Sequence, residues 1–191
     1  MKQNCTFDSN KTFGSYVVTP QNSLLAGMAK LIARHPEKSG EYSSLFVYGK
    51  PGMGKTHLLH AIANELIKSR PTFVIQIVTG RDLMIEAIEA IDDNKLLDFH
   101  KKYSDKVDVL IIDDIHKLCN KAFTQNELLH IFKKLLSNNK QLVFASAVHP
   151  DKIKGLDAEL RTILKWGIVA DIKSPDLNSR TEIAIRNNYI S

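Results

Sequence analysis

The feature that most constrains how this chain can fold is a glycine-rich segment between an apolar run and an amphipathic one. The segment is Gly49-Lys50-Pro51-Gly52-Met53-Gly54-Lys55-Thr56, which fits the pattern G-x-x-x-x-G-K-[ST]. Residues 45–48 before it are apolar and predict a buried strand, and residues 56–67 after it carry apolar side chains at helical spacing. A strand that passes through such a loop into a helix is typical of a phosphate-binding unit.

The residue types in this segment suit the phosphates of a nucleotide. Glycines allow backbone N–H groups to close around phosphate oxygens. The Lys55 side chain can reach the β- and γ-phosphates, and the Thr56 hydroxyl can bind Mg²⁺. We therefore predict that ATP or ADP is bound by Gly49, Pro51, Gly52, Met53, Gly54, Lys55, Thr56 and His57.

Strand-like and helix-like segments alternate along the rest of the chain. Predicted strands cover residues 45–48, 73–78, 107–112, 142–145 and 167–172, and predicted helices cover 22–33, 56–67, 82–91, 95–103 and 124–136. We expect Thr124 to be the N-cap of the last helix. The strands are continuously apolar, which indicates burial on both faces. The pattern therefore predicts an α/β fold in which helices cover both faces of a parallel sheet.

Two carboxylates, Asp113 and Asp114, directly follow the apolar run 109–112. In open α/β sheets ligands bind at the carboxyl ends of the strands, where these two side chains would lie. We expect Asp113 to hold Mg²⁺ together with Thr56, and Asp114 to orient the attacking water, with Lys55 as the second catalytic residue. The alternative is an ordinary turn that contains aspartate. Neither motif establishes that hydrolysis takes place.

Charge and composition leave a nucleic-acid partner open. The chain of 191 residues has a formal net charge of +5, which permits such a partner without requiring one. Lys95, Lys101 and Lys102 lie in a basic segment that also contains Phe99 and Tyr103. Such a segment suits single-stranded nucleic acid, with the aromatic rings as stacking platforms. Acidic residues are interspersed, so a solvated helix face of mixed charge fits equally well.

Nothing in the sequence indicates export or membrane insertion. The N-terminus has no apolar signal core, and the apolar runs are far shorter than the roughly 20 residues of a membrane-spanning helix. Cys5 and Cys119 form no pair with metal-ligand spacing. We therefore predict a cytoplasmic location without a membrane span.

Several of these segments resemble the DnaA family of bacterial chromosomal replication initiators, which are AAA+ ATPases. The resemblance runs from Thr12 to the end of the chain. The matching segments are 12–22, the N-terminal motif around adenine; 54–65, the first nucleotide motif; 110–115, the second motif; 124–132, the following helix; and Trp166-Gly167, before the last strand. The residues around the first motif resemble the initiators more than P-loop proteins in general.

This resemblance implies a three-layer AAA+ sandwich with a five-stranded parallel sheet and ATP-dependent assembly on origin DNA. It places adenine against an apolar wall formed by Phe13, Val17 and Val18. It also implies an N-terminal tail over residues 1–11 and a nucleotide-binding core over 12–191. In the family a helical lid follows the core, and we expect the given sequence to stop near the start of that lid, so that the lid is missing. DNA would be reached through the intact family protein, with self-assembly or contacts to an initiator or helicase as further interactions.

The chain departs from the family at two positions that matter for turnover. The fourth strand of the family ends in a γ-phosphate sensor with an aspartate, whereas here Ser146 is kept and Ala147 occupies the aspartate position. A methyl group forms no hydrogen bond with phosphate. Ile163 occupies the position of the arginine that reaches a neighbouring subunit's ATP. We therefore expect hydrolysis to be weak or absent.

Three functions remain open on this evidence. The first is the nucleotide-switched ATPase domain of a replication initiator. The second is a non-catalytic regulator that binds nucleotide and acts through protein contacts, and the substitutions at Ala147 and Ile163 favour it. The third is a helicase loader, which uses a similar core.

Overall fold

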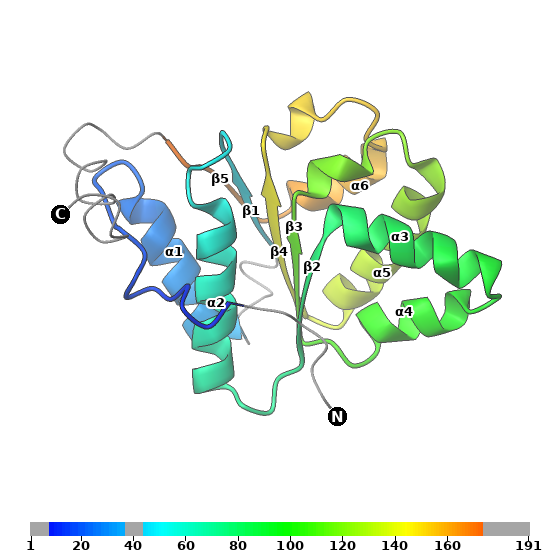
Figure 1. Cartoon of the computed structure of the whole chain (residues 1–191), viewed down its shortest axis with the longest axis horizontal. Helices are drawn as coiled ribbons and strands as arrows, with labels where there is room; N and C mark the ends of the chain where they lie inside the picture. Colours follow the sequence, from blue (N-terminus) through cyan, green and yellow to red (C-terminus); the bar gives the residue numbers. More distant parts are fainter. Residues whose placement is uncertain (1–7, 37–43, 174–191) are drawn as a thin grey trace.

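The computed structural model describes residues 8–36 and 44–173, and its centre is a five-stranded parallel sheet (Figure 1). The strands are β1 (Ser44–Tyr48), β2 (Ile75–Thr79), β3 (Val109–Asp113), β4 (Gln141–Ser146) and β5 (Ile168–Asp171). They lie in the order β2-β3-β4-β1-β5, and every neighbouring pair is parallel. The predicted α/β fold with a parallel sheet is confirmed.

Helices cover both faces of this sheet. The helical elements are α1 (Ser23–Arg34), α2 (Lys55–Ser69), α3 (Gly80–Asp92), α4 (Leu96–Ser104), η2 (Ile115–Leu118), α5 (Ala122–Ser137), η3 (Pro150–Lys152) and α6 (Ala158–Leu164). In Figure 1, α1 and α2 lie on one side of the sheet, and α3, α4, α5 and α6 lie on the other. The three-layer arrangement implied by the resemblance is present.

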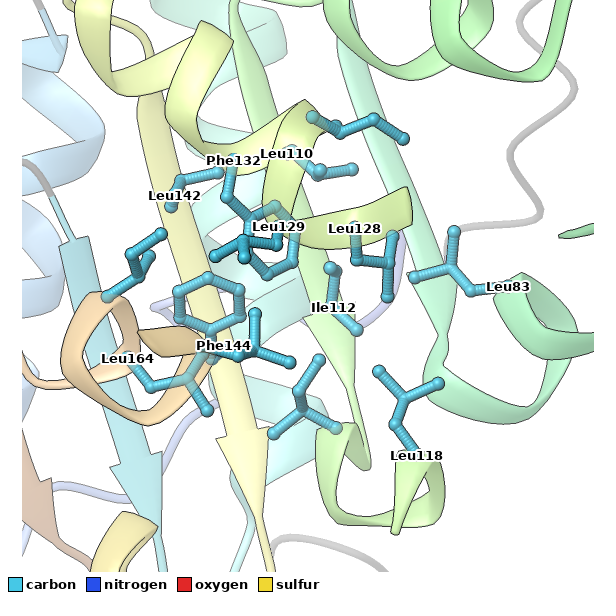
Figure 2. Packing of buried hydrophobic residues seen from close by; sticks show 14 of the residues in the cluster. Leu83, Leu110, Ile112, Leu118, Leu128, Leu129, Phe132, Leu142, Phe144 and Leu164 are labelled. Carbon is cyan, nitrogen blue, oxygen red and sulfur yellow. The ribbon is translucent and has the colours of Figure 1, made fainter. Parts of the chain in front are cut away.

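Each strand contributes side chains to two separate cores. Leu45 and Val47 pack in the cluster under α1 and α2, whereas Phe46, which lies between them, packs in the cluster under α5. Figure 2 shows this second cluster, where Phe132 of α5 meets Phe144 of β4 with ring centroids 5.2 Å apart. Because both faces of the sheet are covered, the central positions of β1, β3 and β4 are apolar and buried, as the sequence predicted, whereas the edge strands β2 and β5 are only partly buried.

The P-loop lies where the strand order reverses. β1 is inserted between β4 and β5, while β2, β3 and β4 follow one another on its other side. A crevice forms at such a switch point, outside the carboxyl ends of the strands. The ends of β1, β3 and β4, at Tyr48, Asp113 and Ser146, therefore lead into one region of the molecule.

Some local predictions are wrong. Thr124 is not an N-cap, because α5 begins at Ala122 and Thr124 is buried within its first turn. β2 and β3 each begin two residues later than expected. Val74 and Asp108 come just before these strands, where the Val74 N–H donates to the Asp108 carboxylate and the Val74 carbonyl oxygen accepts from the Asp108 N–H, so regular strand pairing starts only after them. Asp157 caps α6, a helix that periodicity did not predict, by accepting bonds from the N–H groups of Glu159 and Leu160.

The N-terminal residues described by the structure lie against α2. The side-chain amide of Asn64 donates to the carbonyl oxygens of Asp8 and Lys11, at 3.0 and 2.8 Å. Cys5 and the expected start of the lid fall outside the described residues. Within residues 8–36 and 44–173, no helix has the length and apolar character needed to cross a bilayer.

Candidate nucleotide-binding site

The loop between β1 and α2 has a backbone that only glycine adopts readily. Gly54 has a φ of +88° and precedes the first residue of α2, and Gly52 has a φ of +80°. A side chain at Gly54 would be strained, and its Cβ would lie 3.3 Å from the ring of Tyr16. No side chain caps α2, so the N–H groups of its first turn are available to an anion.

Lys55 holds the loop closed. Its side chain is buried, and its Nζ donates to the carbonyl oxygens of Gly49 and Lys50 at 2.7 and 3.0 Å. Burial lowers the pKa of this ammonium group, while the nearby carboxylates of Asp114 and Asp113 oppose that shift. A phosphate would give the charge of Lys55 a stronger partner than neutral carbonyl oxygens.

Thr56 and Asp113, predicted as the magnesium pair, are in direct contact. The Thr56 hydroxyl donates to Asp113 Oδ2 at 2.5 Å, and Asp113 Oδ1 accepts from the backbone N–H of Asp114 at 2.8 Å. Hydroxyl and carboxylate oxygens are the ligands that Mg²⁺ prefers, so the residues fit the ion. Asp114 has a φ of +50°, and its carboxylate is half exposed.

At the end of β4, the sensor position is linked to a residue that sequence reasoning missed. Ser146 is buried, and its Oγ accepts from the N–H of Val148 at 3.1 Å. The N–H of Ala147 donates to His116 Nδ1 at 3.3 Å. Burial lowers the pKa of His116, which agrees with a neutral ring that accepts at Nδ1.

A cavity of about 170 Å³ lies on one side of the P-loop, where the resemblance implies adenine. Its lining residues are Ser15, Tyr16, Val17, Asn22, Gly52, Met53, Gly54, His57, Ile172 and Lys173. Val17 is among them, but Val18 is not and has 46% of its surface exposed. The expectation that Val18 forms part of this wall is therefore wrong. Phe13 packs against the core beneath α1 and α2 and does not line the cavity.

Polar contacts fix the N-terminal side of this cavity. Asn22 accepts from the Thr19 N–H at 2.7 Å and donates to the Val17 carbonyl at 3.1 Å. His57 Nε2 lies 3.1 Å from the Thr12 carbonyl oxygen and 3.2 Å from Ser15 Oγ. These bonds tie the segment before α1 to α2, so the cavity is closed by residues far apart in sequence.

A second cavity, of about 560 Å³, lies on the other side of the same loop. It shares Met53, Ile172 and Lys173 with the first cavity, so the two hollows meet at the P-loop. Ala147 and Tyr48 also line it, which places it at the ends of β4 and β1.

The prediction that Phe99 and Tyr103 serve as stacking platforms for nucleic acid is wrong. Phe99 and Tyr103 lie on the face of α4 that packs into the core, and Tyr103 has no exposed surface. Lys95 donates to Asp93 at 2.8 Å, and Lys102 donates to Glu86 at 2.5 Å. Lys101 is exposed on α4, so a contact with nucleic acid would depend on charge alone.

The position expected for a neighbour-reaching arginine faces the interior. Ile163 is 4% exposed and packs in the core cluster beneath α5. The two basic residues near it are also engaged within the chain. Arg161 donates to the carbonyl oxygens of Ile153 and Leu156 at 3.2 and 3.1 Å, and Lys165 donates to Asp151 at 2.7 Å.

Comparisons with protein families and with curated proteins both find similarity to bacterial DnaA. The model of the bacterial DnaA ATPase domain matches residues 7–171. The chromosomal replication initiator protein DnaA of Deinococcus radiodurans is 38% identical over 182 residues, which is 95% of this chain and 38% of the relative. The DnaA of Caldanaerobacter subterraneus is 39% identical over 178 residues, which is 93% of this chain and 40% of the relative. The chain thus spans about two fifths of the length of these relatives.

Solved structures of DnaA proteins are also similar to this chain. Domain III of the Thermotoga maritima DnaA superposes with a TM-score of 0.91 at 35% identity, covering 95% of this chain and 75% of that one. AMPPCP-bound DnaA from Aquifex aeolicus superposes with a TM-score of 0.88 at 29% identity, covering 97% of this chain and 56% of that one. A DnaA bound to AMPPCP and single-stranded DNA superposes with a TM-score of 0.85 at 29% identity, covering 96% of this chain and 56% of that one. The DnaC helicase loader, at 18% identity and a TM-score of 0.73 over 86% and 97% of the two chains, shares the fold alone.

Proposed function

Because the chain belongs to the bacterial DnaA ATPase-domain family, we propose that it binds ATP or ADP with Mg²⁺ as the nucleotide-binding domain of a DnaA-like replication initiator. One observation carries this proposal: the P-loop lysine, the following threonine and the strand-end aspartate form one cluster. Lys55 bonds to the loop carbonyls and Thr56 bonds to Asp113, although 57 residues separate the latter two. The solved relatives that hold AMPPCP have the same fold.

Each residue of the cluster has a distinct task. The backbone N–H groups of the loop and of the first turn of α2 receive phosphate oxygens. Lys55 exchanges its bonds to the Gly49 and Lys50 carbonyls for the β- and γ-phosphates. Thr56 and Asp113 hold Mg²⁺, which neutralises phosphate charge when it is bound. Asp114 lies beside this pair and orients a water molecule.

The cavity beside Val17 accepts the base. Val17, Met53 and Ile172 offer apolar surface to the flat faces of adenine. Tyr16 and Asn22 keep the segment before α1 in place. The proposal thus divides the nucleotide between an apolar hollow for the base and a polar loop for the phosphates.

We further propose that the bound nucleotide controls assembly on origin DNA, in the cytoplasm. A nucleotide shifts assembly only if it binds the assembled form more tightly than the free one. Light scattering with Mg·AMPPCP, Mg·ADP and no nucleotide, each with and without a single-stranded oligonucleotide, tests this step. A larger particle with Mg·AMPPCP than with Mg·ADP supports the switch. Equal particle sizes under all conditions contradict it.

A second candidate function, a nucleotide-binding regulator without turnover, is favoured by Ala147 and Ile163. Ala147 offers only a backbone N–H, which His116 already accepts, and Ile163 is buried. A single-turnover assay with radiolabelled ATP and excess protein distinguishes the two. Retention of ATP over hours supports the regulator, and hydrolysis within minutes supports an active ATPase. A helicase loader stays the third candidate, and binding of a replicative helicase would favour it.

A further inference from the structure

We infer that His116 determines specificity for the γ-phosphate, so that the chain distinguishes a nucleoside triphosphate from a diphosphate even though its sensor aspartate is replaced by Ala147. The inference rests on the proposed nucleotide-binding function. It concerns a residue that follows the acidic pair on η2 and that no P-loop motif includes.

His116 bridges the ends of two neighbouring strands. It follows β3 by three residues, and its Nδ1 accepts the N–H of Ala147, the first residue after β4, at 3.3 Å. The same nitrogen lies 3.8 Å from Asp114 Oδ1. The imidazole therefore lies between the acidic strand end and the sensor position, beside the region that the proposed site gives to the γ-phosphate.

The hydrogen bond to Ala147 determines which ring nitrogen carries the proton. A nitrogen that accepts an N–H bond has no hydrogen of its own, so the proton of the neutral ring is on Nε2. Asp114 and Asp113 favour a charged ring, whereas burial, Lys117 and Lys55 oppose it, and burial is the largest of these effects. The ring is therefore a neutral donor.

The donor on Nε2 is available to a ligand. Within residues 8–36 and 44–173, no hydrogen bond involves this atom, and the side chain keeps 21% of its surface exposed. The charges of Lys55 and Asp113 both act on the ring, which places it within electrostatic range of the phosphate-binding lysine and the magnesium ligand. A hydrogen bond from this N–H group to an anionic phosphate oxygen is stronger than a hydrogen bond between two neutral groups.

Ala147 explains why such a residue is needed here. A methyl side chain neither donates nor accepts a hydrogen bond, so the tip of β4 has no polar side chain at this position. His116 supplies a donor from the neighbouring strand end. ADP has no γ-phosphate and cannot receive this bond, so the residue should affect only triphosphate binding.

Calorimetric titration of the full chain with AMPPCP and with ADP, both with excess Mg²⁺, tests the inference. His116→Ala should weaken AMPPCP binding about tenfold while ADP binding changes less than about twofold. His116→Gln should keep the wild-type ratio, because an amide supplies both an acceptor for Ala147 and a donor for phosphate. His130→Ala, which removes an exposed histidine of α5, is the matched control and should change neither affinity.

Equal weakening for both nucleotides, or no change for AMPPCP, would overturn the inference while the proposed function stands. Failure of the wild-type chain to bind either nucleotide would instead refute the proposed function. If His116→Ala does not fold, the wild-type chain still decides the matter by nitrogen-15 NMR. The Nε2–H resonance should move on addition of AMPPCP and stay in place with ADP, and the same shift with both would contradict the inference.

Discussion

The hydroxyl of Thr56 donates a 2.5 Å hydrogen bond to the carboxylate of Asp113. This contact joins the first turn of α2 to the end of β3, across the intervening strand β4. It brings together the two oxygen ligands that the proposed function assigns to Mg²⁺.

Removal of the Thr56 hydroxyl should abolish the magnesium dependence of nucleotide binding. Thr56→Val keeps the shape of the side chain but has no oxygen to offer the ion. We expect Mg²⁺ to strengthen ADP binding to the wild-type chain about tenfold, and to have almost no effect on the variant. Isothermal titration with Mg²⁺ and with EDTA measures this, and Thr56→Ser is the control that should retain the metal effect. An unchanged metal effect in Thr56→Val would show that the ion lies elsewhere.

Val17 and Val18 offer a matched pair for the base pocket. Val17 is buried and lines the cavity beside the P-loop, whereas Val18 is exposed and does not line it. Val17→Ser should weaken ADP binding about fivefold because apolar contact with the base is lost, and Val18→Ser should leave it unchanged. Fluorescence titration with a labelled ADP measures both. Equal effects of the two substitutions would contradict the assignment of this cavity to the base.

The P-loop, the strands and Asp113 were predictable because local patterns determine them. A loop of the pattern G-x-x-x-x-G-K-[ST] between a strand and a helix is a phosphate-binding motif, and the carboxyl ends of parallel strands meet at one edge. Asp113 therefore could be placed near Thr56 without knowledge of the strand order.

The rest of the site was not predictable, because it depends on contacts between distant segments. Ile172 and Tyr16 reach the cavity only through the packing of β5 and of the segment before α1. His116 gains its role from a bond to Ala147 on another strand. Phe99 and Tyr103 are spaced by one helical turn, which fits a buried face as well as an exposed one, and only the packing of α4 distinguishes the two.

Acidification should destabilise the fold as the partly buried histidines His60 and His116 become protonated. Burial lowers the pKa of His60, whose Nδ1 accepts the N–H of Asp8 at 3.1 Å, and the pKa of His116. The unfolded chain takes up these protons near the ordinary value of 6.5, and the folded chain takes them up only at lower pH. The two neutral histidines therefore make their full contribution to the free energy of unfolding above pH 6.5, and this contribution is lost as the pH falls below 6.5.

Urea unfolding at pH 7.5, 6.5 and 5.5 measures this effect. The free energy of unfolding should fall over the last interval, and His60→Ala should reduce that fall. The carboxylates of Asp8 and Asp157, whose pKa values are lowered from 3.8 by hydrogen bonds, act only at more acidic pH. A free energy that is constant or rises between pH 7.5 and 5.5 would contradict the prediction.

Contact of α4 with single-stranded DNA should depend on charge, because its aromatic rings are buried. Lys101→Ala should weaken binding of a fluorescent oligonucleotide about twofold and reduce the salt dependence by about one unit of slope. Lys68→Ala, which removes a lysine of α2 on the other face of the sheet (Figure 1), is the control. Titrations at two salt concentrations measure both variants, and equal losses would place the DNA contact away from α4.

The central claim, that the loop around Lys55 binds the phosphates of a nucleotide, is tested most directly by the affinity of the chain for Mg·ADP with and without the Lys55 side chain. Lys68→Ala, at the far end of the same helix, is the control. We predict that Lys55→Ala weakens binding about hundredfold while Lys68→Ala binds as the wild-type chain does. An affinity of Lys55→Ala equal to that of the wild-type chain would contradict the claim.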